Sequence, residues 1–265
     1  MSARTSFRVA GEMALLSFAP ACAGPSPVVE RCEAAVAPVP QAVVNGSSIN
    51  SYLGLDERAA EWVVKVSPQE SLASEPPVCT GFAISPTMVV TSTHCKEGAS
   101  MVATVLAGVS ERVIKLIDVR VHDTLPVVLA AVDSSERFQF TAFAPLGVDQ
   151  TSSLIRTRAT VAGYGEDEYG RRGSLRFLVE EIIAIKDEAV LVTANGAGGP
   201  CNGDSGAPLI VRQSGGTVAV LGVLRGGSQN CRGVDLFVRS DILLPWIERE
   251  AGPVPPAPLA ADCSE

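Results

Sequence analysis

Residues 79–95 read CTGFAISPTMVVTSTHC. Two runs rich in apolar and β-branched residues flank a Ser-Pro pair, which is typical of two short strands joined by a turn. Similar short runs, separated by Gly, Pro, Asn and Ser, recur from Val43 to about Phe237. This pattern favours an antiparallel sandwich or barrel, so we expect an all-β fold. Only residues 240–252 (SDILLPWIEREAG), with a Ser-Asp start and a Gly stop, predict a helix.

The composition fits a globular protein and excludes several classes of partner. Of the 265 residues, 46% are hydrophobic and 19% are charged, which favours a packed core over disorder. Acidic residues outnumber Lys and Arg by 29 to 21, for a net charge of −8. That balance disfavours nucleic acid, whose binding requires clustered positive charge. No apolar run reaches about 18 residues, so no membrane-spanning segment is expected.

The two ends of the chain differ from its middle. Two arginines precede an apolar stretch, MALLSFAPACAG, that ends in small-x-small sites, so residues 1–23 are interpreted as an export signal. A disordered or buried N-terminal segment is the alternative, and Cys22 leaves open a lipoprotein-type lipid anchor. Residues 24–42 are rich in Pro and Ala and are interpreted as a linker or propeptide, and residues 251–265 as a Pro-rich tail. We therefore expect a protein that is secreted or held in the periplasm or cell envelope.

The cysteine count agrees with export. The chain has seven cysteines: Cys22, Cys32, Cys79, Cys95, Cys201, Cys231 and Cys263. If Cys22 is removed or lipidated, six remain, and an even number suits three disulfides in an oxidising compartment. No two cysteines have the C-x-x-C spacing and there are only two histidines, so neither a metal nor an organic cofactor is expected.

Residues 201–210 read CNGDSGAPLI, in which Ser205 is either a turn residue or a nucleophile. A serine hydroxyl is an effective nucleophile only when a neighbouring imidazole can take its proton. Only His94 and His122 can supply that imidazole. His94 follows the strand-like TMVV run and precedes Cys95. A disulfide between the two cysteines of the 79–95 stretch would fix the backbone beside His94 and contribute about 3 kcal/mol.

Both stretches resemble motifs of the chymotrypsin/trypsin-like serine peptidases. Residues 79–95 resemble the histidine region C-x-G-x-(L/I)-I-x-x-x-x-V-L-T-A-A-H-C, and residues 201–210 resemble the nucleophile loop G-D-S-G-G-P, with Ala207 in place of one glycine. Weaker similarities follow in the family's order: VVNG at Val43, VAGYG at Val161, GVLRGGSQNC at Gly222 and PWI at Pro245. The resemblance covers roughly residues 43–250. It implies an exported, bacterial-type peptidase domain of two packed six-stranded antiparallel β-barrels, at about 43–140 and 155–240, with a C-terminal helix.

The resemblance also implies roles for single residues. Ser205 is the nucleophile, His94 is the general base, and the N–H groups of Gly203 and Ser205 form the oxyanion hole. Asp204 is not the triad acid; in the family it pairs with the ammonium group that propeptide cleavage frees, here at Val43. The family's spacings imply the disulfides Cys79–Cys95 and Cys201–Cys231. Cys32 and Cys263 remain, and their pairing rests on parity alone.

The third triad residue departs from the family pattern. The family's acid starts a strand written D-I-A-L-L, and alignment of VVLAAV with that strand puts Pro126 at the position of the acid. Asp123, three residues earlier, is the candidate acid, and Asp118 and Asp133 are less favoured. A tight turn before Pro126 would absorb the offset. Loss of the acid is the alternative.

The specificity pocket is expected to be open and free of carboxylates. Its base is Gly199, where trypsin-like relatives keep an Asp, and its walls carry Gly227 and Gly233. Burial of apolar surface in such a pocket gains about 25 cal/mol per Å², so we expect large aliphatic or aromatic side chains before the scissile bond. Arg225, where relatives carry a small Ser, would pair with the acid, replace some of the packing that is missing beside it, or block the pocket.

Two hypotheses about function follow. The first is an exported serine endopeptidase, made as a zymogen, that cleaves protein or peptide substrates through an acyl-enzyme at Ser205. The second is a peptidase-fold binding module whose catalysis has decayed with the loss of the acid. The complete GDSG sequence favours the first.

Overall fold

The computed structural model describes residues 43–55, 60–68, 79–96, 101–107, 110–147, 151–213 and 217–255. The expected export signal, the linker, most of the C-terminal tail, Cys22 and the Cys32–Cys263 pair lie outside the described residues.

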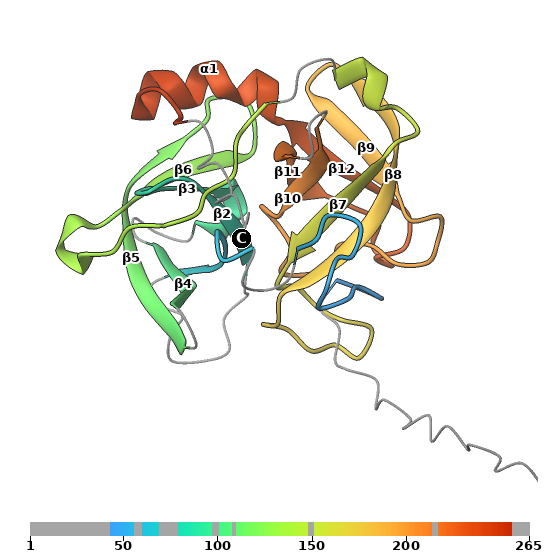
Figure 1. The fold of residues 1–265 in the computed structure, drawn as a ribbon, viewed down its shortest axis with the longest axis horizontal. Helices are drawn as coiled ribbons and strands as arrows, with labels where there is room; N and C mark the ends of the chain where they lie inside the picture. The colour runs from blue at the N-terminus through green and yellow to red at the C-terminus, as the bar shows by residue number, and fades with distance from the viewer. Residues whose placement is uncertain are drawn as a thin grey trace, which may run out of the picture. The chain divides into compact units, whose positions relative to one another are not determined.

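The twelve strands of the described residues form two closed antiparallel barrels of six strands each, as the sequence predicts (Figure 1). The first barrel consists of β1 (Val63–Pro68), β2 (Cys79–Ser85), β3 (Met88–Ser92), β4 (Met101–Ala107), β5 (Ser110–Val121) and β6 (Val127–Val132). The second consists of β7 (Arg158–Gly163), β8 (Arg176–Lys186), β9 (Ala189–Thr193), β10 (Pro208–Arg212), β11 (Val218–Gly226) and β12 (Val234–Arg239). The strand orders are β1-β2-β3-β6-β5-β4 and β10-β11-β12-β9-β8-β7, so each barrel is built from the same connections.

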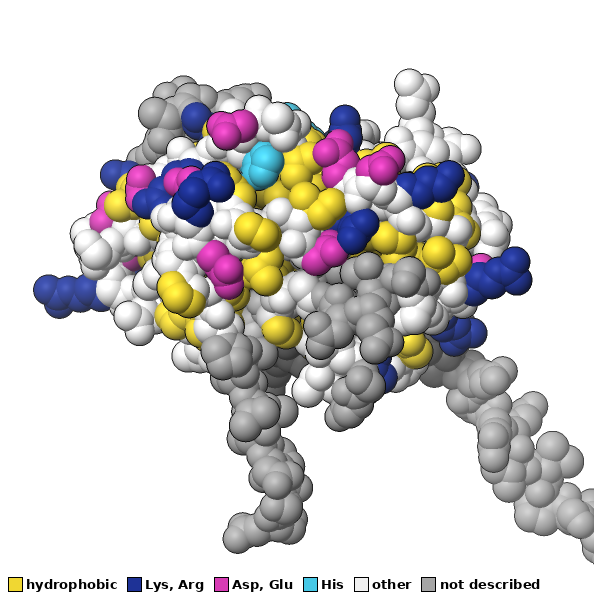
Figure 2. Space-filling view, turned by 90° about the horizontal axis from the view of Figure 1, so that it is seen from above, with side chains coloured by type: hydrophobic (Ala, Val, Ile, Leu, Met, Phe, Trp, Pro, Cys, Tyr) yellow, Lys and Arg dark blue, Asp and Glu magenta, His cyan; other side chains and the backbone are white. Residues whose placement is uncertain are grey.

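Each barrel buries the alternating apolar side chains of its strands. Phe82, Ile114 and Leu129 are fully buried in the first barrel, and Leu221 and Phe237 in the second. On the face shown in Figure 2, the acidic and basic side chains of the described residues are interspersed, so these residues offer no run of positive charge on that face.

An α-helix, α1 (Ser240–Ala251), follows the last strand. It ends where the sequence predicts, at Gly252, whose φ of +82° suits a glycine and whose N–H donates to the carbonyl of Glu248. The ring of Trp246 lies 5.0 Å from the ring of His122, so the helix also packs against the first barrel. No helix in the described part of the chain is long and apolar enough to cross a membrane.

Two of the three expected disulfides are present among the described residues. Cys79 and Cys95 are joined across β2 and the turn after β3, with 5.8 Å between their Cα atoms. Cys201 and Cys231 join the loop before β10 to the loop before β12, with 5.1 Å between their Cα atoms. Both pairings agree with those that the family spacings imply.

The loop before β10 lies directly on the first barrel, and Gly206 makes this contact possible. Gly206 has a φ of +86°, and a Cβ atom there would lie 2.4 Å from the carbonyl oxygen of Thr80 and 2.4 Å from Oγ1 of Thr91. Thr80 fixes the loop, because its N–H donates to the carbonyl of Ser205 (3.0 Å) and its hydroxyl to the carbonyl of Gly203 (3.1 Å).

Replacement of Gly206 by Ala should therefore destabilise the protein more than an ordinary glycine replacement. Gly206→Ala combines a strained left-handed backbone, at about 1–2 kcal/mol, with overpacking of a further 1–3 kcal/mol or so. Gly196→Ala is the matched control, since Gly196 also has a positive φ (+83°) but no described atom within 4 Å of its Cβ position. Urea unfolding should show a clearly larger loss for Gly206→Ala. Equal losses would mean that the close contact contributes nothing.

Candidate active site

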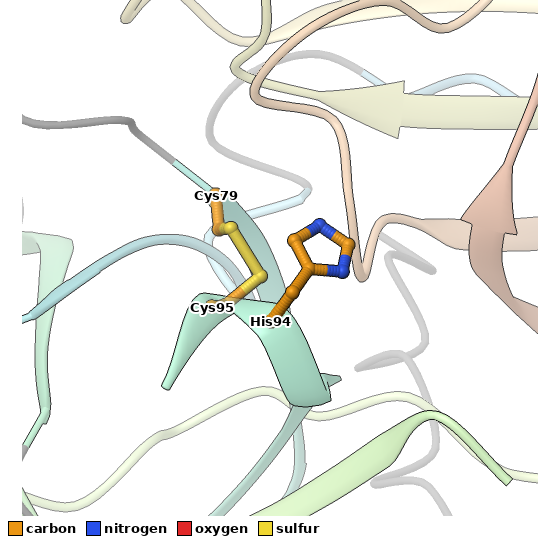
Figure 3. A group of neighbouring side chains, drawn as sticks. All are labelled: Cys79, His94 and Cys95. Carbon is orange, nitrogen blue, oxygen red and sulfur yellow. A yellow bond between two sulfur atoms is a disulfide. The ribbon is translucent and has the colours of Figure 1, made fainter. Parts of the chain in front are cut away.

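His94 lies at the end of the first barrel that faces the loop before β10. It belongs to the short 3-10 helix η2 (Thr93–Cys95), which directly follows β3. Figure 3 shows the imidazole of His94 beside the Cys79–Cys95 disulfide. The ring and the two sulfur atoms lie within 4.8 Å of one another. Because the sulfurs are bonded to each other, they offer no thiolate to a metal ion.

The imidazole of His94 is held by a neighbouring hydroxyl. Oγ of Ser92 lies 3.0 Å from Nδ1 of His94 and 3.2 Å from the carbonyl oxygen of Pro126. Ser92 is fully buried, whereas His94 is partly exposed. Partial burial lowers the pKa of His94, which favours the neutral, proton-accepting form of the ring.

Ser205 lies beside the segment that carries His94. Its carbonyl oxygen is 3.6 Å from Sγ of Cys95, the residue after His94, and Ser205 is half-buried and lines a cavity. Among the described residues no hydrogen bond joins the Ser205 hydroxyl to His94. Such bonds are often long in a free enzyme and tighten when substrate binds. The structure therefore brings the predicted nucleophile and base to adjoining segments of the two barrels.

Two backbone N–H groups around Ser205 have no partner among the described residues. The N–H groups of Gly203 and Ser205 donate to no other described residue, whereas the N–H of Asp204 donates to the carbonyl of Cys201. The two free N–H groups are held in direction by their own peptide planes. The carbonyl of Asn202 accepts from Glu166 (2.8 Å), and that of Asp204 accepts from Ala207 (2.8 Å).

In a planar trans peptide, the N–H points away from the carbonyl oxygen of the preceding residue. The fixed carbonyls of Asn202 and Asp204 therefore fix the directions of the N–H groups at Gly203 and Ser205. The φ of Gly203, +97°, is accessible mainly to glycine.

Asp204 is fully buried behind this loop. Its carboxyl oxygens accept from the N–H of Gly165 (2.7 Å) and of Cys201 (2.8 Å). A Cβ atom at Gly163 would lie 2.0 Å from Oδ1 of Asp204, so the glycines of the VAGYG stretch make room for this carboxyl group. Burial raises the pKa of Asp204 to about 7. Val43 is also fully buried, and the N–H of Val44 donates to the carbonyl of Gly199 (3.1 Å).

The cavity beside Ser205 has a volume of about 250 Å³. Of the three glycines expected to form the pocket, Gly227 lines the cavity, and Gly199 and Gly233 do not. Its other walls are formed by Pro200, Cys201, Asn202, Leu224, Gly226, Ser228, Gln229 and Cys231. Arg225 is half-exposed and pairs with Glu188 at 3.8 Å, so it neither lines nor blocks the cavity.

A buried carboxyl group stands where the sequence predicts none. Oδ1 of Asp235 lies 1.8 Å from the position that a Cβ of Gly227 would take, and Oδ2 lies 3.0 Å from that of Gly199. Asp235 thus fills the space between these two glycines, next to the expected pocket, although it does not line the cavity beside Ser205. Burial and the charge of Asp235 raise the pKa of Glu180 to about 9, and burial raises the pKa of Asp235. Uptake of a proton by either carboxyl group removes its charge and so relieves the repulsion between them.

Strand alternation offered a signal for both carboxyl residues. Asp235 is two residues before the fully buried Phe237, and Glu180 is two residues before the fully buried Ile182. Residues two apart in a strand share a face, so each acid belongs to an inward-facing row. Neither acid was predicted from the sequence to lie in such a row.

None of the three candidate acids is hydrogen-bonded to His94 in the described part of the chain. Asp123 is exposed. Asp118 pairs with Arg120, two residues further along β5. Asp133 accepts from the N–H of Ser135 (2.9 Å), which lowers its pKa. The structure therefore does not join the predicted acid Asp123 to the predicted base.

The side chain of His122 is hydrogen-bonded within a local turn. Its Nδ1 accepts from the N–H groups of Thr124 (3.2 Å) and Leu125 (3.1 Å). These bonds form the expected turn before Pro126, but the turn leaves Asp123 at the surface. Of the two histidines, only His94 lies next to Ser205.

Comparison with known proteins agrees with this geometry. The family model described as Trypsin matches residues 55–247, which is more than half of the chain. The chain is also 26% identical over 215 residues to brachyurin from Leptuca pugilator, a match that covers 67% of this chain and 89% of that protein. Together with the two closed barrels, the family match shows that this chain belongs to the trypsin family of serine peptidases.

Proposed function

We propose that the protein is a serine endopeptidase in which Ser205 is the nucleophile and His94 the general base. The observation that carries this proposal is the pair of rigidly directed N–H groups at Gly203 and Ser205, which donate to no described residue and lie next to a cavity. Two N–H groups that belong to half-exposed residues and have no partner among the described residues are available to a developing negative charge.

The reaction proceeds through an acyl-enzyme. Oγ of Ser205 attacks the carbonyl carbon of the scissile bond while its proton passes to Nε2 of His94. The oxyanion accepts hydrogen bonds from Gly203 and Ser205. The C–N bond then breaks, and the amine leaves with the proton held by His94. Water next attacks the ester, gives its proton to His94, and displaces the acid product as Ser205 regains its proton.

A fluorophosphonate probe tests this proposal directly. The probe should label the protein covalently at Ser205, because only an activated serine reacts with it. Ser205→Ala should abolish labelling while the protein remains folded. An unlabelled parent protein that still binds peptides would favour the alternative, a peptidase-fold binding module. The absence of a described carboxylate bonded to His94 is the observation that keeps this alternative in view.

The cavity beside Ser205 supports cleavage after apolar side chains. Its volume of about 250 Å³ exceeds the roughly 150 Å³ that holds a benzene molecule in an engineered cavity. Asp235 is fully buried and does not line the cavity, so it offers a substrate cation no direct contact. Leu224 and the Cys201–Cys231 disulfide give an apolar part of the wall.

A peptide library should show preference for Leu or Phe over Arg or Lys before the scissile bond. Asp235→Asn is the matched variant, and it should leave this preference unchanged because the carboxyl group lies behind the wall. A preference for Arg or Lys that disappears in Asp235→Asn would contradict the proposal and assign specificity to Asp235.

We propose further that the protein is exported and made as a zymogen cleaved before Val43. The disulfides are typical of an oxidising compartment. Asp204 and Val43 are both fully buried. Cleavage would place a new ammonium group at Val43, within the same domain as a buried carboxyl group that has no cationic partner among the described residues. An ion pair between them would hold the loop that bears Gly203.

The stability of the uncleaved protein should fall as pH rises from about 4 to 7. The pKa of Asp204 is raised to about 7 in the folded state, so the folded state binds the proton more tightly than the unfolded state does. Deprotonation above the unfolded pKa of about 4 then destabilises the fold, on the order of a few kcal/mol by pH 7. Urea midpoints at several pH values measure this decline.

Asp204→Asn should make the decline shallower over the same range. Asp235 and Glu180 act in the same direction, because their pKa values are also raised, so a residual slope should remain. Cleavage at Val43 should also reduce the slope, since an ammonium partner lowers the pKa of Asp204. A slope that Asp204→Asn leaves unchanged would exclude Asp204 as its source.

A further inference from the structure

Two positions at which this chain departs from the family pattern lie close to Nδ1 of His94. The quoted histidine motif ends in T-A-A-H-C, whereas this chain has Thr-Ser-Thr-His-Cys, so Ser92 stands where the motif has its first Ala. The triad acid of the family is replaced by Pro126. In the structure, Oγ of Ser92 lies between Nδ1 of His94 (3.0 Å) and the carbonyl oxygen of Pro126 (3.2 Å).

We propose that Ser92 is the positioning residue of His94, in place of a carboxylate. The hydroxyl of Ser92 orients the imidazole and selects its tautomer, and the carbonyl of Pro126 orients the hydroxyl. The inference rests on the proposed function insofar as it concerns turnover, but the hydrogen-bond arrangement can be tested without any turnover.

The proposal assigns a direction to each of the two hydrogen bonds of Ser92. When the Ser92 hydroxyl makes both bonds at once, its single proton is donated to Pro126, because a carbonyl oxygen only accepts. The lone pairs of Oγ then face Nδ1 of His94, which must carry the proton to make the second bond. A neutral imidazole with its proton on Nδ1 has its free lone pair on Nε2. That is the tautomer a general base needs to take the proton of Ser205.

The acceptor at Pro126 is itself fixed. Its carbonyl oxygen also accepts from the N–H of Thr93 (3.1 Å). Val127, the residue after Pro126, is paired with Ser92 in the β3–β6 ladder. Because Ser92 is fully buried, water does not compete for its hydroxyl. The backbone of the first barrel therefore holds the hydroxyl in place.

The charged and titratable groups described around His94 are not bonded to its ring. Asp204, in the loop opposite, accepts from backbone N–H groups. Arg225 pairs with Glu188. Lys96 is half-buried and Asp123 is exposed, and no hydrogen bond joins either to His94. Within the described residues the ring therefore lacks a bonded counter-charge, in agreement with a pKa that burial alone lowers.

Nuclear magnetic resonance of the two imidazoles tests the hydrogen-bond arrangement in the full chain. At alkaline pH, ¹⁵N shifts should show His94 protonated at Nδ1. His122, whose Nδ1 accepts two backbone N–H bonds, should be protonated at Nε2 and serves as an internal control. Ser92→Ala should release the preference of His94 and leave that of His122 unchanged. A parent His94 protonated at Nε2, or a preference that survives Ser92→Ala, would overturn the proposal.

Kinetics of the processed enzyme test the role in catalysis. Ser92→Ala should lower kcat about tenfold to a hundredfold with little change in KM, because the ring loses its orientation but the substrate sites remain. The matched control, Asp123→Asn, should leave kcat unchanged. If Asp123→Asn lowers kcat as strongly and Ser92→Ala does not, the sequence-based candidate is the positioning residue and Ser92 is not.

Restoring the family's acid separates positioning from mere packing. The double variant Ser92→Ala/Pro126→Asp should recover kcat relative to Ser92→Ala alone. A carboxylate would also stabilise the imidazolium form, so the acidic limb of the kcat/KM profile should move to higher pH than in the parent. Absence of both effects, with the unfolding midpoint unchanged, would count against the proposal. If the parent shows no labelling or turnover but the Nδ1 proton depends on Ser92, the peptidase function fails and the assignment of Ser92 stands.

Discussion

The contact of Gly206 with the first barrel is the constraint on which the candidate site depends. Without a side chain at Gly206, the loop before β10 reaches Thr80, whose N–H and hydroxyl donate to the carbonyls of Ser205 and Gly203. The hydroxyl of Thr80 also accepts from the N–H of Tyr164 in the second barrel (3.0 Å). Ser205, the proposed nucleophile, thus precedes a strand of one barrel but is fixed to the other barrel, in which β3 leads to His94. Catalysis by orientation requires such fixed geometry.

The two barrels differ in the carboxyl groups that they bring near the candidate site. The second barrel and its loops bury Asp204, Asp235 and Glu180, whose pKa values are raised, and also Asp167, which pairs with Arg171. Among the described residues of the first barrel, no carboxyl group is hydrogen-bonded to His94. Burial of an acid without a cation costs free energy and is tolerated when the acid takes up a proton. Before cleavage, the second barrel is therefore most stable when Asp204, Asp235 and Glu180 are protonated. A buried ammonium group would favour the charged form of a nearby acid and so change this state.

Sequence patterns predicted the elements of the fold, but they did not predict the side-chain contacts that depend on the pairing of distant segments. Strands, α1 and both described disulfides follow from alternation, stop residues and family spacings. The bond from Ser92 to His94 spans two residues, yet it depends on the carbonyl of Pro126, which only the pairing of β3 with β6 brings close. Asp235 was missed because one polar residue in a strand suggests an outward face, although the row it shares with Phe237 points inward.

A neutral hydroxyl and a carboxylate contribute differently to a histidine base. Both can select the tautomer with the proton on Nδ1, but only the carboxylate stabilises the positive charge that forms when the ring takes the serine proton. With Ser92 in this role, His94 becomes charged without a bonded counter-ion, which raises the barrier of the first step. The stabilisation that remains must come from the amides of Gly203 and Ser205. In serine peptidases whose triad is damaged, the catalysis that persists comes from such oxyanion donors and from substrate binding. If His94 has no carboxylate partner, catalysis therefore depends most on the rigid peptide planes around Ser205, which direct these amides.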